Sequence, residues 1–235
     1  MVLSYPFWAR VFKREFSPQL SAIVEALEKR TLPAFDGIEK EAEGVSEKAW
    51  EGFMSRAASG DEDPAGLAEA AQEAGISHYL LLAGIRQGMI NLFAAALYHA
   101  FEQQVMLFHR KQLLHPSEEY DPSLFGMTEL QKRLTRSGID ITAFSSWARV
   151  NELRLVANTA KHAQGESARK LYQQRPDLFE HPQLPETGLF SPRGQPRVFL
   201  PLVGEDLYLS LEDVQQYRDA VVQFWEEFAS AIEHA

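Results

Sequence analysis

The sequence predicts an all-α protein, a helical bundle around one long central helix, with a small β-hairpin before the C-terminal helix. Two observations lead to this class. Apolar residues recur at helical spacing through most of the 235 residues, and one run of 37 residues, His78–Leu114, is interrupted only by two glycines. Hydrophobic residues make up 45% and charged residues 24% of the chain, which is typical of a folded soluble domain. We expect one domain over residues 1–235.

Residues 1–60 are expected to form an N-terminal helical extension. Ser17-Pro18 is typical of a helix start, with a capping hydroxyl and a proline in the first turn. Pro33 should kink or restart the helix, and residues 34–57 show a weaker helical pattern before a loop at 59–63. The apolar positions after Ser17 keep helical spacing: Leu20, Ile23, Val24, Leu27 and Leu32.

Residues 64–180 are expected to form the core of the bundle. Asp63-Pro64 opens a helix that can break at Gly75, because Ser77 can cap a new one. The following run, His78–Leu114, would be about 55 Å long at the rise of an α-helix, so it should form the central column.

The first half of this run is apolar enough to resemble a membrane span. Arg86, Gln87 and Asn91 lie in its middle, and an arginine at the centre of a bilayer costs about 2.5–3.5 kcal/mol. We therefore expect a helix covered by protein on most sides, and no membrane association.

The rest of the core and the C-terminal part follow from turn and cap residues. His115-Pro116 ends the central helix, and Gly138 and Gly165 end later ones. A loop and hairpin are expected over 181–209, and a C-terminal helix over 210–235. The predicted elements are helices at 128–136, 143–163, 167–174 and 211–232, a loop at 181–196, and hairpin strands at 198–200 and 207–209.

Composition narrows the class of protein. The chain has no cysteine, which excludes disulfides, thiolate metal sites and cysteine nucleophiles. The first 16 residues carry charges within their apolar run and lack a small-residue cleavage site, so we expect no secretory signal and a cytoplasmic protein. The net charge of −10 disfavours nucleic-acid binding over the whole surface.

The charge is unevenly distributed along the chain. Residues 128–175 contain nine Lys and Arg against four Asp and Glu, a net +5 that leaves −15 for the remainder. Such a segment is typical of an anion or RNA footprint. The alternative is a set of helices whose basic residues pair with acidic neighbours.

A cluster of polar residues on the predicted helix 143–163 is the main candidate site. Four residues lie within an arc of about 100° on an otherwise apolar helix: Arg154, Asn158, Lys161 and His162. The cations can hold a phosphodiester, the asparagine can orient it, and the histidine can move protons. The alternative is a buried polar seam in which Arg154 pairs with Glu102.

A second polar group lies on the central helix. His99, Glu102 and Gln103 stand at i, i+3 and i+4, so they share one face. We expect this supporting seam to lie within contact range of the Arg154–His162 face, because polar groups in an apolar helix need partners. The scattered histidines form no metal box, and we expect neither a metal nor a cofactor.

The order of these motifs resembles the HEPN superfamily of helical nucleotide-binding domains. The long helix with HAFEQQ is followed by a short helix, GIDI and then W-x-x-V-x-E-L-R-x-x-x-N-x-x-K-H, which together cover about His78–Phe179. The resemblance implies a homodimer, and it implies a metal-independent endoribonuclease of a toxin–antitoxin or phage-defence system. Possible partners are RNA and an antitoxin or another defence component.

The family signature is an arginine, usually followed by a polar residue, and a histidine after four to six residues. By residue, Arg154 matches the arginine and His162 the histidine. Here seven residues separate them, and Leu155 follows the arginine. These departures favour the alternative of a non-catalytic HEPN-like interaction or regulatory module. A third hypothesis is a helix-turn-helix DNA binder, although its recognition helix would be apolar near its start.

Overall fold

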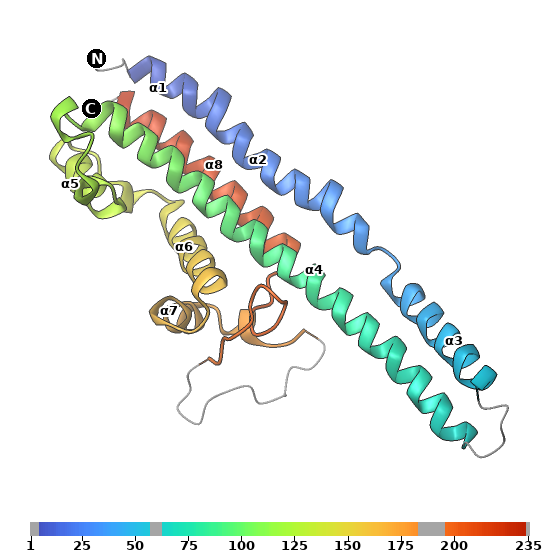
Figure 1. Ribbon diagram of the computed structural model, residues 1–235. Helices are drawn as coiled ribbons and strands as arrows, with labels where there is room; N and C mark the ends of the chain where they lie inside the picture. Colours follow the sequence, from blue (N-terminus) through green and yellow to red (C-terminus); the bar gives the residue numbers. More distant parts are fainter. Residues whose placement is uncertain (1–4, 57–62, 183–195, 234–235) are drawn as a thin grey trace.

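The structure is a computed structural model that describes residues 5–56, 63–182 and 196–233 (Figure 1). The described part is all-α and contains no β-strand. The predicted loops at 59–63 and 181–196 lie mostly outside the described residues. The helices are α1 Tyr5–Val11, α2 Ser17–Ala26, α3 Ile38–Arg56, α4 Pro64–Phe108, α5 Met127–Arg136, α6 Trp147–His162, α7 Glu166–Gln174 and α8 Leu211–Glu233.

The N-terminal rod is helical from Tyr5 to Phe35, because two π-helical turns join its α-helical parts. The turns are Phe12–Phe16 and Leu27–Thr31. Each lies just ahead of a proline, Pro18 or Pro33, and a wider turn accommodates a residue that has no N–H to donate. The helix start predicted at Ser17 is wrong, because the chain is already helical from Tyr5 through Phe16 and continues without a break into α2.

The rod ends a little beyond the predicted restart at Pro33. The residues around Pro33 form a 3₁₀ turn, Leu32–Phe35, and the chain bends at Asp36 and Gly37 before α3. Gly37 has a φ of 82°, a left-handed conformation that favours glycine.

The long helix α4 runs from Pro64 to Phe108 and continues as a π turn to Leu113. The side chain of Asp63 caps it by accepting a hydrogen bond from the Ala65 amide at 3.0 Å. The break predicted at Gly75 is wrong, because this residue lies inside the contact with α3. A Cβ at Gly75 would lie 2.8 Å from the Ala42 carbonyl oxygen, so its small size lets the two helices approach closely.

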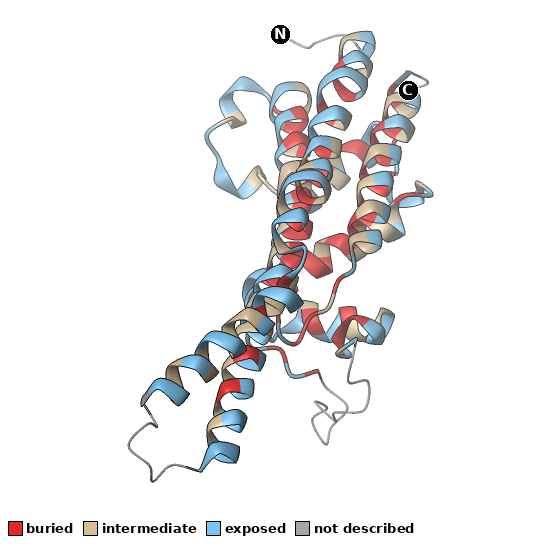
Figure 2. Cartoon of the chain, turned by 90° about the vertical axis from the view of Figure 1, so that its right-hand side faces the viewer, coloured by how far each residue is buried: buried red, intermediate tan, exposed pale blue. Residues whose placement is uncertain are grey.

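The core lies where the N-terminal rod and α8 pack against the second half of α4 (Figure 1). Its centre is a group of aromatic rings: Phe12, Phe101, Phe224, Trp225 and Phe228. Trp225 Nε1 donates to Gln104 Oε1 at 3.0 Å, which satisfies two buried polar groups together. Figure 2 shows the buried residues gathered in this bundle, whereas the arm of α3 and the first half of α4 is mostly exposed.

The prediction that α4 is covered on most sides is confirmed only for its second half. Eleven of its thirteen buried residues lie from Gly88 onward. Its first half exposes Leu80 and Leu81 by 60% and 59%. By length and composition alone, α4 is apolar enough to cross a membrane, and 33% of its most apolar window is buried in the protein.

The β-hairpin predicted at 198–209 is wrong, since these residues form an irregular loop. Side chains form hydrogen bonds with backbone groups of this loop, in place of the expected cross-strand ladder. Buried Asn91 Nδ2 donates to the carbonyls of Pro201, at 2.6 Å, and Leu207, at 2.8 Å. The Asp206 carboxylate accepts from the Phe199 amide at 2.9 Å. These three bonds take the place of the ladder, and the two from Asn91 fix the loop on α4.

Candidate functional site

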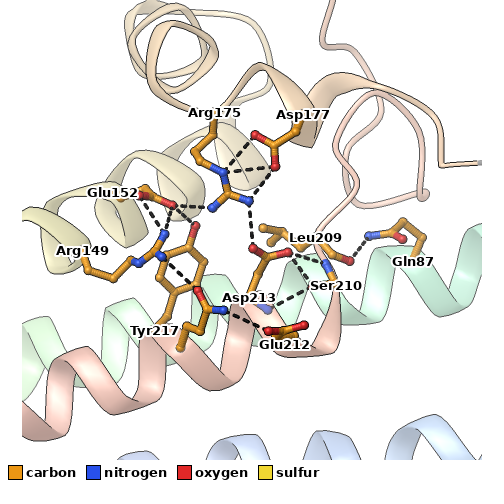
Figure 3. A network of polar contacts seen from close by, with 11 residues as sticks. Gln87, Arg149, Glu152, Arg175, Asp177, Leu209, Ser210, Glu212, Asp213 and Tyr217 are labelled. Atoms are coloured by element: carbon orange, nitrogen blue, oxygen red, sulfur yellow. Dashed lines mark hydrogen bonds and ion pairs between the residues drawn. The ribbon is translucent and has the colours of Figure 1, made fainter. Parts of the chain in front are cut away.

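A network of polar contacts ties α6, α7 and α8 together around Arg175 (Figure 3). Its guanidinium bonds to Glu152 Oε1 and Asp213 Oδ1, both at 2.9 Å. Tyr217 donates to the same Glu152 oxygen at 2.7 Å, and burial together with this carboxylate raises the pKa of the phenol. Every member has a charged or hydrogen-bonding partner, so this network is a structural junction of three helices.

Most of the predicted basic segment is neutralised by ion pairs. Arg133 bonds to Glu118 and Glu129, and this contact lowers the pKa of Glu118 to about 2. Arg169 and Lys170 pair with Glu166. The predicted alternative of basic helices that pair with acidic neighbours therefore describes most of 128–175. Among the described residues, three basic side chains of the segment have no carboxylate partner: Arg136, Arg154 and Lys161.

Arg154 is the half-buried member of these three. Its Nε donates to the neutral Asn151 Oδ1 at 3.0 Å, and no other partner of the guanidinium lies among the described residues. Arg154 and Asn151 line a cavity of about 300 Å³ between α4, α5 and α6, together with Tyr98, Met127, Thr128, Gln131, Trp147 and Val150. A half-buried guanidinium with two free NH₂ groups at a cavity wall is suited to bind an anion.

From α4, Tyr98 lines this cavity and contacts one of the polar residues predicted as the supporting seam. Tyr98 donates to Glu102 Oε1 at 3.4 Å, and His99 Nδ1 lies 3.3 Å from Glu102 Oε2. Burial, followed by the Glu102 charge, raises the pKa of Tyr98, whereas the Arg154 charge acts in the opposite direction. Tyr98 is thus under the influence of both charges, although Glu102 and Arg154 form no direct ion pair in the described structure.

The other predicted site residues are not brought into the cavity. Asn158 is half-buried one turn further along α6, and Lys161 and His162 are exposed at its end. Gln103 is exposed, and its neighbour Gln104 is the glutamine that the core uses. Within one chain, the Arg154 cavity and His162 are therefore separate features of α6.

The residues of the cavity that sequence reasoning missed include four that can contact a ligand through an aromatic ring or an amide: Tyr98, Gln131, Trp147 and Asn151. Asn151 lies one turn and Trp147 two turns before Arg154 on the same helix, so helical spacing could have added them. Gln131 comes from α5, and only the packing of α5 against α6 brings it near Arg154. The described residues hold no group of three or more His, Asp or Glu that could bind a metal ion.

Comparison of the chain with protein-family models, with curated proteins and with solved structures finds no match. The fold class established by the structure is all-α. The HEPN resemblance stays a prediction that depends on the motifs in the sequence.

Proposed function

We propose that this chain is a HEPN-like RNA-binding protein that cleaves RNA without a metal ion, as a homodimer, in a toxin–antitoxin or phage-defence system. The observation that carries the proposal is Arg154, a half-buried arginine at a cavity wall with a neutral partner. Its free NH₂ groups match the geometry of a phosphodiester. The motif resemblance at Arg154 and His162 supplies the reaction class.

In the proposed reaction a ribose 2′-hydroxyl attacks the adjacent phosphorus and the bond to the 5′-oxygen breaks. A 2′,3′-cyclic phosphate and a 5′-hydroxyl result. Arg154 stabilises the negative charge that develops on the phosphate, and His162 transfers a proton. Because His162 lies outside the Arg154 cavity of its own chain, the proposal requires a second copy whose own helix end completes the site.

An exposed apolar surface supports the homodimer. It combines the first half of α4 with the 198–209 loop that crosses this helix, and it consists of Leu80, Leu81, Ile85, Phe199, Leu202 and Val203. These side chains are 39–63% exposed. Exposed apolar side chains gathered on neighbouring segments are typical of protein interfaces.

The second candidate is a non-catalytic HEPN-like module that binds RNA or a protein partner. The exposed position of His162 outside the cavity favours it. The helix-turn-helix hypothesis has less support, because α6 contacts α4, α7 and α8 and carries seven buried residues. A recognition helix needs a free face to enter the major groove.

The test incubates the full-length protein with labelled single-stranded RNA in EDTA. Wild type is expected to cleave. His162→Ala should reduce the rate by roughly 100-fold or more with binding retained. Arg154→Ala should weaken both binding and cleavage, the binding by roughly 10-fold. Arg169→Ala removes an arginine that is paired with Glu166, so it is the matched control and should behave as wild type.

Binding without cleavage in the wild type would favour the module. Wild-type protein that neither binds nor cleaves RNA would overturn the ribonuclease and leave only a module with a protein partner. Full cleavage by both variants would overturn the non-catalytic module and the roles given to Arg154 and His162.

A further inference from the structure

Two hollows lie next to each other along α5. The first, of about 500 Å³, is lined by residues of α5 and the segment after it, including Lys132 and Arg136. The second is the Arg154 cavity, of about 300 Å³. Thr128 and Gln131 line both hollows, so the two adjoin along α5, and together we call them the α5 groove.

Basic side chains stand at both ends of the α5 groove. Lys132 and Arg136 are exposed in the first hollow, and Arg154 lies in the second. Among the described residues, the one carboxylate that pairs with Lys132 is Glu129, at 3.8 Å, and such an exposed pair is weak. Asp140 also lines the first hollow, but one of its oxygens already accepts from the Thr142 amide and hydroxyl.

The second hollow has an apolar part and a polar part. Met127, Trp147 and Val150 form the apolar part, and Trp147 is half-buried, with part of its surface accessible. The polar part is supplied by Gln131 and Asn151 beside Arg154. The Gln131 amide and Asn151 Nδ2 have no bonding partner among the described residues, whereas Asn151 Oδ1 is occupied by Arg154 Nε.

We propose that the α5 groove binds a single-stranded segment of RNA, with one base inserted beside Trp147 in the second hollow. This inference rests on the proposed function, which it extends by naming the form of the substrate. Base–aromatic stacking and a basic track for the backbone are the two requirements of single-strand binding, and the groove has both. The phosphate next to the inserted base lies on Arg154, and the neighbouring phosphates lie on Lys132 and Arg136.

The free amide of Gln131 gives the hollow a preference for adenine. A carboxamide presents one donor and one acceptor side by side, and it pairs in two bonds with N7 and the N6 amino group of adenine. Asn151 cannot offer the same pattern, because its oxygen is already taken by Arg154. The groove is therefore expected to select a strand that has adenine at one position.

The test measures anisotropy of labelled A₆, C₆ and U₆ oligoribonucleotides in EDTA, with the His162→Ala background to prevent cleavage. A₆ is expected to bind roughly 10-fold more tightly than C₆. Gln131→Leu should remove this difference. Trp147→Leu should weaken the binding of all three oligonucleotides by roughly 10-fold. Because Trp147 also contacts Phe224, Trp147→Phe serves as a second variant that keeps a ring and should lose less.

Backbone contacts are tested by salt. Lys132→Ala and Arg136→Ala should each reduce the slope of log affinity against log salt concentration by the amount expected for about one phosphate contact. Neither variant should change the base preference. Arg218→Ala, which removes an arginine paired with Asp219, is the matched control.

Equal affinity for the three oligonucleotides, or binding unaltered by Gln131→Leu and Trp147→Leu, would overturn the proposal that the α5 groove binds RNA. If wild type still cleaves RNA in that case, the proposed function stands alone. If the protein does not cleave RNA but shows a base preference that depends on Gln131, the proposed RNA binding by the α5 groove is supported. The proposed ribonuclease activity is then overturned.

Discussion

Gly84 of α4 and Gly204 of the 198–209 loop touch through their backbones. A Cβ on Gly204 would overlap the Gly84 carbonyl group, and Gly204 has a φ of 92°. A side chain at position 204 is therefore excluded both by the contact and by the left-handed backbone conformation.

Gly204→Ala should lower the free energy of unfolding by about 2–4 kcal/mol, because the loop must move away from α4 and the backbone is strained. Urea unfolding measures the change. Gly44→Ala is the matched control: Gly44 lies in α3 with open space around its Cα, so alanine should stabilise the protein by about 0.5–1 kcal/mol. Equal stability of the Gly204→Ala variant and wild type would contradict the close contact.

Arg175 should be the most sensitive arginine of the basic segment. Arg175→Met would leave Asp213 without its basic partner, whereas Glu152 would keep Arg149, and we expect a loss of about 2–4 kcal/mol in unfolding free energy. Arg169→Ala, which removes an exposed pair, should change the same quantity by less than about 1 kcal/mol. Similar losses in the two variants would refute the role of Arg175 as a junction of three helices.

His109 should make the protein less stable in acid. It is fully buried, and neither ring nitrogen has a hydrogen-bond partner in the described structure. Burial lowers its pKa, and the nearby charge of Arg133 acts in the same direction, against Glu129 and Glu118. The unfolded chain therefore binds a proton more readily, so stability is present above about pH 6.5 and falls as the pH drops below it.

His109→Leu should flatten this part of the pH profile. The difference between the two proteins should reach at most about 1.4 kcal/mol per pH unit below pH 6.5, since one proton is involved. Unfolding in urea between pH 5 and 8 gives both curves. Parallel curves would show that His109 does not carry the pH dependence.

The exposed apolar surface predicts how the chain associates. Leu81→Glu should shift a homodimer toward monomer and leave the thermal unfolding temperature of the subunit nearly unchanged, because the side chain is 59% exposed. Light scattering coupled to size-exclusion chromatography measures the mass. Tyr120→Ala alters a residue that is 90% exposed elsewhere and should keep the wild-type mass. A wild-type protein that is monomeric at high concentration would eliminate this interface.

The sequence predicts the helices of this protein better than its loops and contacts. Helical spacing identifies the long central helix, and the cap at Asp63 is found where predicted. The loop at 198–209 has the alternating pattern of strands, but that pattern reflects burial of Val198, Leu207 and Leu209. Whether such residues pair as strands depends on which groups satisfy their backbone, and here distant Asn91 does so.

The candidate site, too, could be predicted only in part from the sequence. Helix periodicity places Arg154 among polar neighbours, but it cannot reveal that Arg133 and Arg175 are neutralised by residues distant in the sequence. Nor can it bring Gln131 of α5 to the same cavity. Periodicity within one helix predicts which residues share a face, whereas the chemistry of that face depends on the neighbouring helices.

The π turn Phe12–Phe16 also sets the phase of the N-terminal rod. Its buried residues Trp8, Phe12, Phe16, Leu20 and Val24 recur every four residues, and in a regular α-helix such a row would drift by about 40° at each step. The wider turn absorbs part of this drift and keeps the row against α4 and α8. Deleting one residue within Phe12–Phe16 would therefore rotate α1 by about 100° about the axis of the rod. Trp8 would turn away from Phe108, while every residue after Ser17 keeps its place.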